Sequence, residues 1–340
     1  MAERRLKPAL GAALTIAIAA VVLLEARPAY DRPAVHAAAS ASPGLLAKLP
    51  DGRRLNFRCS GHGAPTVLME AGFGATSLAW YKVQPVLAKS HRVCAYDRAG
   101  AGFSDPGPLP RDGAAIARDL DDGLKAAGIS GPLVMVGHSA GGLYVRLFAD
   151  RRPDDVIGMV LVDPSVEHQD VRGGPGAAIA AVRARTARCE AAAEQHALPS
   201  PDPLLSVCTP RTPADPLDAN YQADLKRALQ PTTWSTQLSE LDNLWTATSV
   251  ELDAGRPSYG DLPLVVLTAG GPSPGPSSPT QGSISPAKTQ MHSEVAERST
   301  RGETELVAGS SHMMMFDRPD AIVAAVDKVI AESKERPKAD

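Results

Sequence analysis

Residues 133–149 constrain the fold of this chain more than any other segment does. They read LVMVGHSAGGLYVRLFA, which is an apolar strand, a glycine-rich corner and a helix, with Ser139 at the corner. Gly137 and Gly141 lack side chains, so a strand and a helix can approach each other there around a sharp turn. Such a turn presents the serine hydroxyl above the sheet. We interpret the segment as a nucleophile elbow with Ser139 as the candidate nucleophile.

A second segment fits the same G-x-S-x-G pattern. It is GPSPG at residues 271–275, and it also follows an apolar run, at residues 264–267. Pro274, Pro276 and Pro279 prevent a helix from starting after it. Only at Ser139 would a helix N-terminus direct free N–H groups toward the reacting oxygen. Ser273 is therefore not a candidate nucleophile.

A serine hydroxyl is a weak nucleophile at neutral pH, so Ser139 needs a histidine base and a carboxylate that orients the base. His312 follows a predicted strand at residues 303–308 and a turn of small residues, and it precedes an amphipathic helix at 321–330. It is the candidate base. His138 lies inside the elbow, where its side chain is expected to pack or hydrogen-bond beside the site. Surface positions are expected for the remaining six histidines, which are His36, His62, His91, His168, His196 and His292.

Four segments resemble the α/β-hydrolase-fold serine hydrolases. They are VLMEAGFG at residues 67–74, YDRAGAGFSD at 96–105, the Ser139 elbow with the following Asp163, and the His312 loop, and together they span nearly all of the chain after residue 50. The resemblance implies an α/β fold with a mostly parallel, doubly wound sheet and a helical cap inserted after the sixth strand. It also implies esterase-like or lipase-like chemistry by a serine nucleophile.

An oxyanion hole is a further implication of the resemblance, because the tetrahedral intermediate carries negative charge on the former carbonyl oxygen. In the family, two backbone N–H groups hold this charge. One belongs to the residue after the nucleophile, here Ala140, and the other to the loop after the third strand. The histidine-glycine pair usual in that loop is Ala71-Gly72 here, so alignment of Gly72 assigns the second N–H to Phe73. A packing role is the alternative for Phe73.

The carboxylate of the triad is ambiguous in the sequence. Most family members carry it after the seventh strand, but residues 264–293 contain no Asp or Glu. A second family placement follows the sixth strand, where the apolar run at 158–162 ends at Asp163. The order Ser139, Asp163, His312 is the one expected for this fold. Asp163 is therefore the preferred acid, with Glu167 and Asp170 as alternatives, and a structural role for Asp163 in the turn stays open.

The chain has 340 residues, of which 44% are hydrophobic, which suffices for one large core. Its net charge of −3 carries no nucleic-acid signature. We predict a hydrolase core at residues 43–165 and 260–340, interrupted by a helical cap at 166–259 with helices near 177–195 and 220–229. Trp234, Leu241 and Trp245 either line a substrate pocket in this cap or pack it onto the core. A loop rich in Pro, Gly and Ser is predicted at 270–286, near the active-site face.

Residues 1–42 are predicted to be a signal peptide, with an uncleaved signal anchor as the alternative. Arg4, Arg5 and Lys7 precede an uncharged stretch at 8–24, and an alanine-rich tract at 34–41 offers cleavage sites. The protein is therefore expected to be exported, either secreted or periplasmic, or anchored to the membrane by this segment.

Export makes the four cysteines informative, because an even number in an oxidising compartment predicts disulfides. Three pairings are possible. The strands that carry Cys59 and Cys94 are sheet neighbours in the fold that the resemblance implies, and Cys189 and Cys208 fall together in the predicted cap. The expected pairs are therefore 59 with 94 and 189 with 208, and buried free thiols are the alternative for the first pair.

The sequence thus predicts an exported serine hydrolase that cleaves small or medium carboxylic esters through an acyl-enzyme intermediate. No cofactor, metal or nucleic-acid partner is expected, and membrane contact is expected only through the N-terminal segment. The alternatives are amide, lactone or carbon–carbon bond hydrolysis by the same triad, and a non-catalytic binding protein with the same fold.

Overall fold

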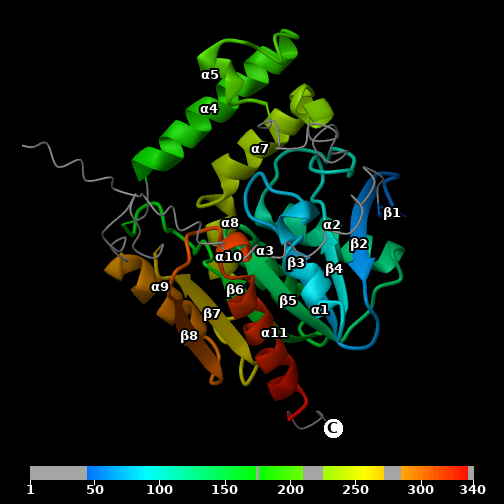
Figure 1. Cartoon of the computed structure of the whole chain (residues 1–340), viewed down its shortest axis with the longest axis vertical. Coiled ribbons are helices and arrows are strands. Elements are labelled where there is room, and N and C mark those ends of the chain that lie inside the picture. Colours follow the sequence, from blue (N-terminus) through cyan, green and yellow to red (C-terminus); the bar gives the residue numbers. More distant parts are fainter. Residues whose placement is uncertain (1–43, 174–175, 210–224, 272–284, 336–340) are drawn as a thin grey trace, which may run out of the picture. The chain divides into compact units, whose positions relative to one another are not determined.

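The computed structural model describes residues 44–173, 176–209, 225–271 and 285–335 (Figure 1). These residues contain an eight-stranded sheet in the order β1-β2-β4-β3-β5-β6-β7-β8. Its strands are β1 (Leu45–Lys48), β2 (Arg54–Ser60), β3 (Thr66–Glu70), β4 (Arg92–Tyr96), β5 (Leu133–His138), β6 (Val156–Val162), β7 (Leu264–Ala269) and β8 (Gly302–Val307). The pairs β1/β2 and β2/β4 are antiparallel, and the other pairs are parallel. The predicted mostly parallel sheet is confirmed.

Helices cover both faces of this sheet (Figure 1). One face packs against α2 (Gly113–Ala126), α3 (Gly141–Arg151) and α9 (Pro286–Ala296). The other packs against the 3-10 helix η1 (Ser77–Trp80), α1 (Gln84–Leu87), α10 (Met314–Asp317) and α11 (Pro319–Ser333). Alternate residues of a strand point to opposite faces, so Leu68 of β3 enters the first core and Val67 the second. Because both faces are covered, β3 and β5 are buried along their whole length, as their apolar runs predict.

A helical insertion joins β6 to β7. It contains α4 (Gly176–Glu194), α5 (Pro203–Ser206), α7 (Pro231–Asn243) and α8 (Ala247–Asp253). The predicted helix at 177–195 corresponds to α4, and of the one predicted at 220–229 only a helical turn at 225–228 lies in the described residues. In Figure 1, α4 and α5 extend away from the sheet, whereas α8 lies close to α3. The division into core and cap stays a prediction.

The three apolar residues singled out in this insertion have different positions. Leu241 and Trp245 pack with Leu143 and Tyr144 of α3, so they hold the insertion against the core. Trp234 is 8% exposed, donates its indole N–H to the Ala228 carbonyl at 2.8 Å, and borders a cavity described below. The packing interpretation therefore holds for two of the three.

Both predicted disulfides are confirmed. Cys59 and Cys94 face each other across the antiparallel pair β2/β4, and their sulfurs are bonded. Cys189 near the end of α4 is bonded to Cys208, which follows α5. Within the described ranges, no helix combines the length and the apolar character needed to cross a membrane. The predicted signal segment, most of the loop predicted at 270–286, and Ser273 lie outside the described residues.

Candidate active site

Ser139 lies at the corner between β5 and α3. Its φ angle is +51°, a left-handed conformation that strains a residue with a side chain. The neighbouring glycines permit this turn: a Cβ at Gly137 would lie 2.6 Å from the Gly141 carbonyl oxygen, and one at Gly141 would lie 2.6 Å from that of Glu70. The strand, turn and helix predicted for the elbow are therefore present.

Three side chains from separate segments meet at this corner. His312 Nε2 lies 3.0 Å from Ser139 Oγ, and His312 Nδ1 lies 2.6 Å from Asp163 Oδ2. Asp163 follows the last residue of β6, and His312 lies in the loop between β8 and α10. These strand ends share one edge of a parallel sheet, which explains how His312 meets Asp163 and Ser139, 149 and 173 positions before it. The structure thus brings together the three residues named from the sequence as nucleophile, acid and base.

The Asp163 carboxylate is buried and accepts several hydrogen bonds. Besides His312, its donors are the Ala269 N–H, at 2.8 Å from Oδ1, and the Lys288 ammonium, at 2.6 Å from either oxygen. Burial alone would raise the pKa of Asp163, but the hydrogen bonds from His312, Lys288 and Ala269 outweigh it and hold the pKa well below its usual range. Asp163 therefore remains ionised at any pH at which the protein would work.

His138 supports the loop that carries the candidate base. Its Nε2 donates to the His312 carbonyl oxygen at 2.8 Å, and the two imidazole rings lie 4.7 Å apart. Burial, together with the nearby charge of His312, lowers the pKa of His138 to about 4. The ring is therefore neutral near pH 7 and carries its proton on Nε2, and it acts as expected from the sequence, by hydrogen bonding beside the site.

The expectation for His292 was wrong. It is 1% exposed rather than on the surface, and its Nδ1 and Nε2 lie 2.7 Å from Thr268 Oγ1 and 3.0 Å from the Pro164 carbonyl oxygen. Burial lowers its pKa to about 4. The helix α9 that carries His292 also carries Lys288, and sequence reasoning missed both residues. The one available signal was their i, i+4 spacing, which puts them on one face of a helix.

The alternative acids are placed elsewhere. Glu167 accepts from the Arg146 guanidinium at 2.6 and 2.9 Å and also pairs with Arg298. Burial would raise the pKa of Glu167, but Arg146 lowers it to about 2. Among the described residues, no hydrogen bond joins Glu167 or Asp170 to His312.

The two N–H groups assigned to an oxyanion hole border the elbow. Ala140 precedes the first turn of α3, where backbone N–H groups lack partners within the helix. The loop that carries Phe73 runs directly against the elbow, because a Cβ at Gly72 would lie 2.7 Å from His138 Nδ1 and 3.2 Å from Ser139 Cβ. Within the described ranges, neither the Phe73 nor the Ala140 N–H has an assigned backbone acceptor.

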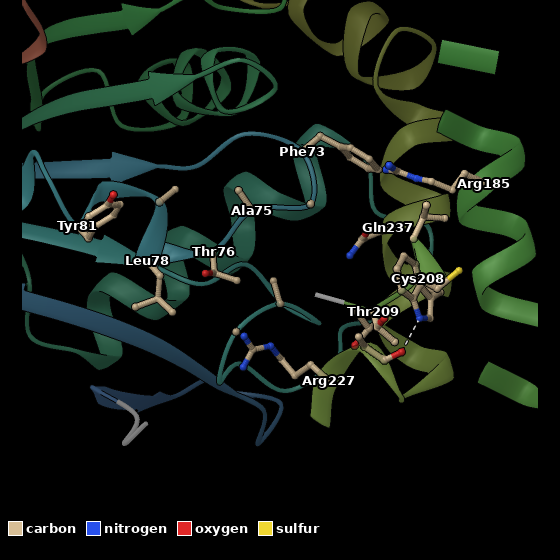
Figure 2. Close-up of a pocket in the computed structure, with 18 of the residues that line it drawn as sticks. Phe73, Ala75, Thr76, Leu78, Tyr81, Arg185, Cys208, Thr209, Arg227 and Gln237 are labelled. Carbon is tan, nitrogen blue, oxygen red and sulfur yellow. Dashed lines mark hydrogen bonds between the residues drawn. The ribbon is translucent and has the colours of Figure 1, made fainter. Parts of the chain in front are cut away.

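A cavity of about 540 Å³ opens beside Phe73, between this loop and the helical insertion (Figure 2). In Figure 2, Phe73, Ala75, Thr76 and Leu78 border it from one side, and Arg185, Cys208, Arg227 and Gln237 border it from the insertion. Phe316, four residues after His312, also contributes to its wall. Ser139, Asp163 and His312 do not line this cavity, which borders the loop of the candidate oxyanion hole through Phe73.

Comparisons with known proteins agree with the fold. A family model described as alpha/beta hydrolase fold matches residues 65–188. The protein YqjL of Bacillus subtilis is 34% identical over 106 residues, which are 31% of this chain and 42% of that protein. An AB hydrolase superfamily protein of Gibberella zeae is 34% identical over 113 residues, which are 32% of this chain and 35% of that protein. The chain thus spans less than half the length of these relatives.

Solved structures extend the likeness beyond the matched segment. A thermophilic esterase from Thermogutta terrifontis superposes with a TM-score of 0.58 over 86% of this chain and 99% of that one, at 18% identity. At this identity the superposition shows a shared fold. The sheet order, the family match over residues 65–188 and this superposition together show that the chain has the α/β-hydrolase fold.

Proposed function

We propose that the protein is an exported serine hydrolase that cleaves small or medium carboxylic esters through an acyl-enzyme intermediate, without a cofactor. One observation carries the proposal. A continuous hydrogen-bonded chain runs from the Asp163 carboxylate through both nitrogens of His312 to Ser139 Oγ, with the serine held at a strained corner. This is the arrangement that raises the nucleophilicity of a serine.

In the first half of the proposed reaction, Ser139 Oγ attacks the ester carbonyl carbon while His312 Nε2 takes the hydroxyl proton. Asp163 accepts a hydrogen bond from the Nδ1–H of His312, which leaves Nε2 free to act as the base. The N–H groups of Phe73 and Ala140 hold the oxyanion of the tetrahedral intermediate. His312 then returns the proton to the leaving alkoxide, the ester C–O bond breaks, and the acyl group remains on Ser139.

The second half repeats these steps with water. His312 Nε2 takes a proton from a water molecule, whose oxygen attacks the acyl carbon. The collapse of the second tetrahedral intermediate releases the carboxylic acid and returns the proton to Ser139. Asp163 stays ionised throughout, because its hydrogen bonds keep its pKa well below the usual range.

The cavity beside Phe73 supports an ester of limited size. A volume of about 540 Å³ falls within the range of sites that bind small organic molecules. Apolar and aromatic residues make up much of its wall, including Leu78, Trp234 and Phe316. The fold shared with a thermophilic esterase adds support for esters as the substrate class. The two disulfides support export, since such bonds persist in oxidising compartments.

The test is a panel of p-nitrophenyl esters with acyl chains of graded length, assayed with wild type, Ser139→Ala and Ser273→Ala. The proposal expects wild type and Ser273→Ala to hydrolyse the shorter esters equally, and Ser139→Ala to lose turnover. A wild type that a fluorophosphonate labels but that leaves all esters intact would indicate amide, lactone or carbon–carbon bond substrates. A wild type that is neither labelled nor active would indicate a binding protein.

A further inference from the structure

Arg98 is a buried cation that contacts the loop of the proposed oxyanion hole. It follows β4, its side chain is 4% exposed, and acceptor atoms of four residues surround its guanidinium. Nη1 donates to Glu70 Oε1 at 2.7 Å and to the Ala71 carbonyl oxygen at 2.6 Å. Nη2 donates to the Gly72 carbonyl oxygen at 2.8 Å and to Glu240 Oε1 at 2.9 Å. Arg98 therefore fixes two consecutive peptide groups of this loop.

The second of these peptides is the one that carries the Phe73 N–H. Its C=O belongs to Gly72 and accepts from Arg98, while its N–H belongs to Phe73. A hydrogen bond from a cation to the oxygen of a peptide polarises the whole amide, and polarisation passes along such chains of hydrogen bonds in a low-dielectric interior. Arg98 thereby makes the Phe73 N–H a stronger donor and restricts its direction.

Glu240 ties the same guanidinium to the helical insertion. It lies on α7, is 4% exposed, and accepts from both Nε and Nη2 of Arg98. Helix α7 also packs closely against this region, since a Cβ at Gly100 would lie 2.5 Å from Thr236 Oγ1 and one at Gly74 would lie 3.4 Å from Gln237 Oε1. A buried ion pair therefore fixes the Arg98 guanidinium relative to α7.

We propose that Arg98 is a positioning residue for the oxyanion hole and that Glu240 links its position to the helical insertion. The inference rests on the proposed ester hydrolysis, in which the Phe73 N–H binds the oxyanion. Arg98 does not touch the substrate; it acts through the peptide between Gly72 and Phe73. Its contribution grows as negative charge develops on the carbonyl oxygen, so it affects the transition state more than the bound substrate.

The chain offers a matched control for a buried arginine. Arg146 is 0% exposed and is held by Glu167 at 2.6 and 2.9 Å and by the Tyr259 hydroxyl at 3.1 Å. It lies on α3, and none of these three contacts involves the loop that carries Phe73. Arg146→Lys and Glu167→Gln should therefore destabilise the protein by disturbing a buried ion pair, without affecting the oxyanion hole.

The experiment measures kcat and KM with a p-nitrophenyl ester, the inhibition constant of a trifluoromethyl ketone that forms a tetrahedral adduct, and the melting temperature. Active sites are counted from the end point of fluorophosphonate labelling. Arg98→Lys is expected to lower kcat per active site by about tenfold to a thousandfold, with KM within about threefold. The inhibition constant should rise by the same factor as kcat falls. Arg146→Lys should lower the melting temperature yet keep kcat per active site within about threefold.

Glu240→Gln is the second variant, and it is isosteric, so it tests the link even where Arg98→Lys fails to fold. It should lower kcat and raise the inhibition constant of the ketone by a common factor of about ten, whereas Glu167→Gln should change neither. Equal kcat per active site in the Arg98 and Arg146 variants, or in the Glu240 and Glu167 variants, would overturn the inference. A wild type that is neither labelled nor active would instead overturn the proposed function on which the inference rests.

Discussion

Replacing Asp163 by Asn is the most informative single change, because the structure specifies what each atom of the new amide would meet. Asp163 accepts from three donors: the Ala269 N–H at Oδ1, the His312 Nδ1–H at Oδ2, and the Lys288 ammonium, which is equidistant from both oxygens. An asparagine offers one oxygen and one NH₂ in place of two oxygens. One donor must therefore lose its acceptor, and Lys288 favours neither orientation.

The choice falls between Ala269 and His312. Turning the NH₂ toward Ala269 leaves a buried backbone N–H without an acceptor, at a cost of about 1–3 kcal/mol. Turning it toward His312 costs less, because the imidazole moves its proton from Nδ1 to Nε2 and then accepts from the amide. The proton on Nε2 removes the base from Ser139. We therefore expect the inactive tautomer to dominate in Asp163→Asn.

The expected loss is up to about ten-thousandfold in kcat, as a wrong tautomer causes in the serine-protease triad. This corresponds to about 5 kcal/mol of transition-state stabilisation at 1.36 kcal/mol per decade. The assay is p-nitrophenyl ester hydrolysis per folded protein, with circular dichroism to establish folding. Glu167→Gln is the control and should keep near-normal turnover, since Glu167 binds Arg146 and Arg298. A folded Asp163→Asn with kcat within tenfold of wild type would refute the reasoning.

Three further predictions follow from separate parts of the molecule. Replacing Cys189 and Cys208 by Ser should lower the unfolding free energy by about 3 kcal/mol in a urea titration, because it frees a loop closed over 19 residues; an unchanged midpoint would contradict this. Burial holds the pKa of His292 at about 4, so the folded state binds fewer protons than the unfolded state between pH 6.5 and 4, and stability is lost as the pH falls through this window. His292→Gln should therefore reduce the difference in unfolding free energy between pH 7 and pH 4 by up to about 3 kcal/mol, and an equal difference in both proteins would show that His292 does not titrate as stated. Gly72→Ala should lower kcat at least about tenfold, because its Cβ would lie 2.7 Å from His138 Nδ1 in the elbow. Gly176→Ala is the control and should keep its kcat, because open space surrounds Gly176. Equal kcat in the two variants would exclude strain at the elbow.

The sequence predicted the parts of the molecule that local chemistry dictates. The glycines around Ser139 are required by contacts of 2.6 Å, so their spacing alone indicated the sharp turn. Apolar runs bounded by turns indicated buried parallel strands, and the ends of such strands meet at one edge of the sheet. The resemblance to the α/β hydrolases assigned Asp163 as the preferred acid, and the structure brings His312 to both Asp163 and Ser139.

Contacts between distant segments could not be predicted from the sequence in the same way. His292 was expected on the surface because no strand and turn frame it as they frame His312, yet its ring nitrogens bond Thr268 and the Pro164 carbonyl oxygen. Lys288 reaches Asp163 across 125 residues, a pairing that no local pattern encodes. Arg98 and Glu240 are 142 residues apart, and a charged residue in an irregular segment or on a helix is more often exposed than buried. Such pairs depend on how the insertion packs, which periodicity does not determine.

The central claim is that Ser139 is an activated nucleophile, and covalent labelling tests it most directly. A fluorophosphonate reacts with a serine only where a base has activated it and an oxyanion hole stabilises the adduct. Peptide mapping by mass spectrometry after labelling should find one adduct, on the peptide that contains Ser139, and Ser139→Ala should abolish labelling while Ser273→Ala should not. An adduct on residues 271–275, or persistent labelling of Ser139→Ala, would contradict the account.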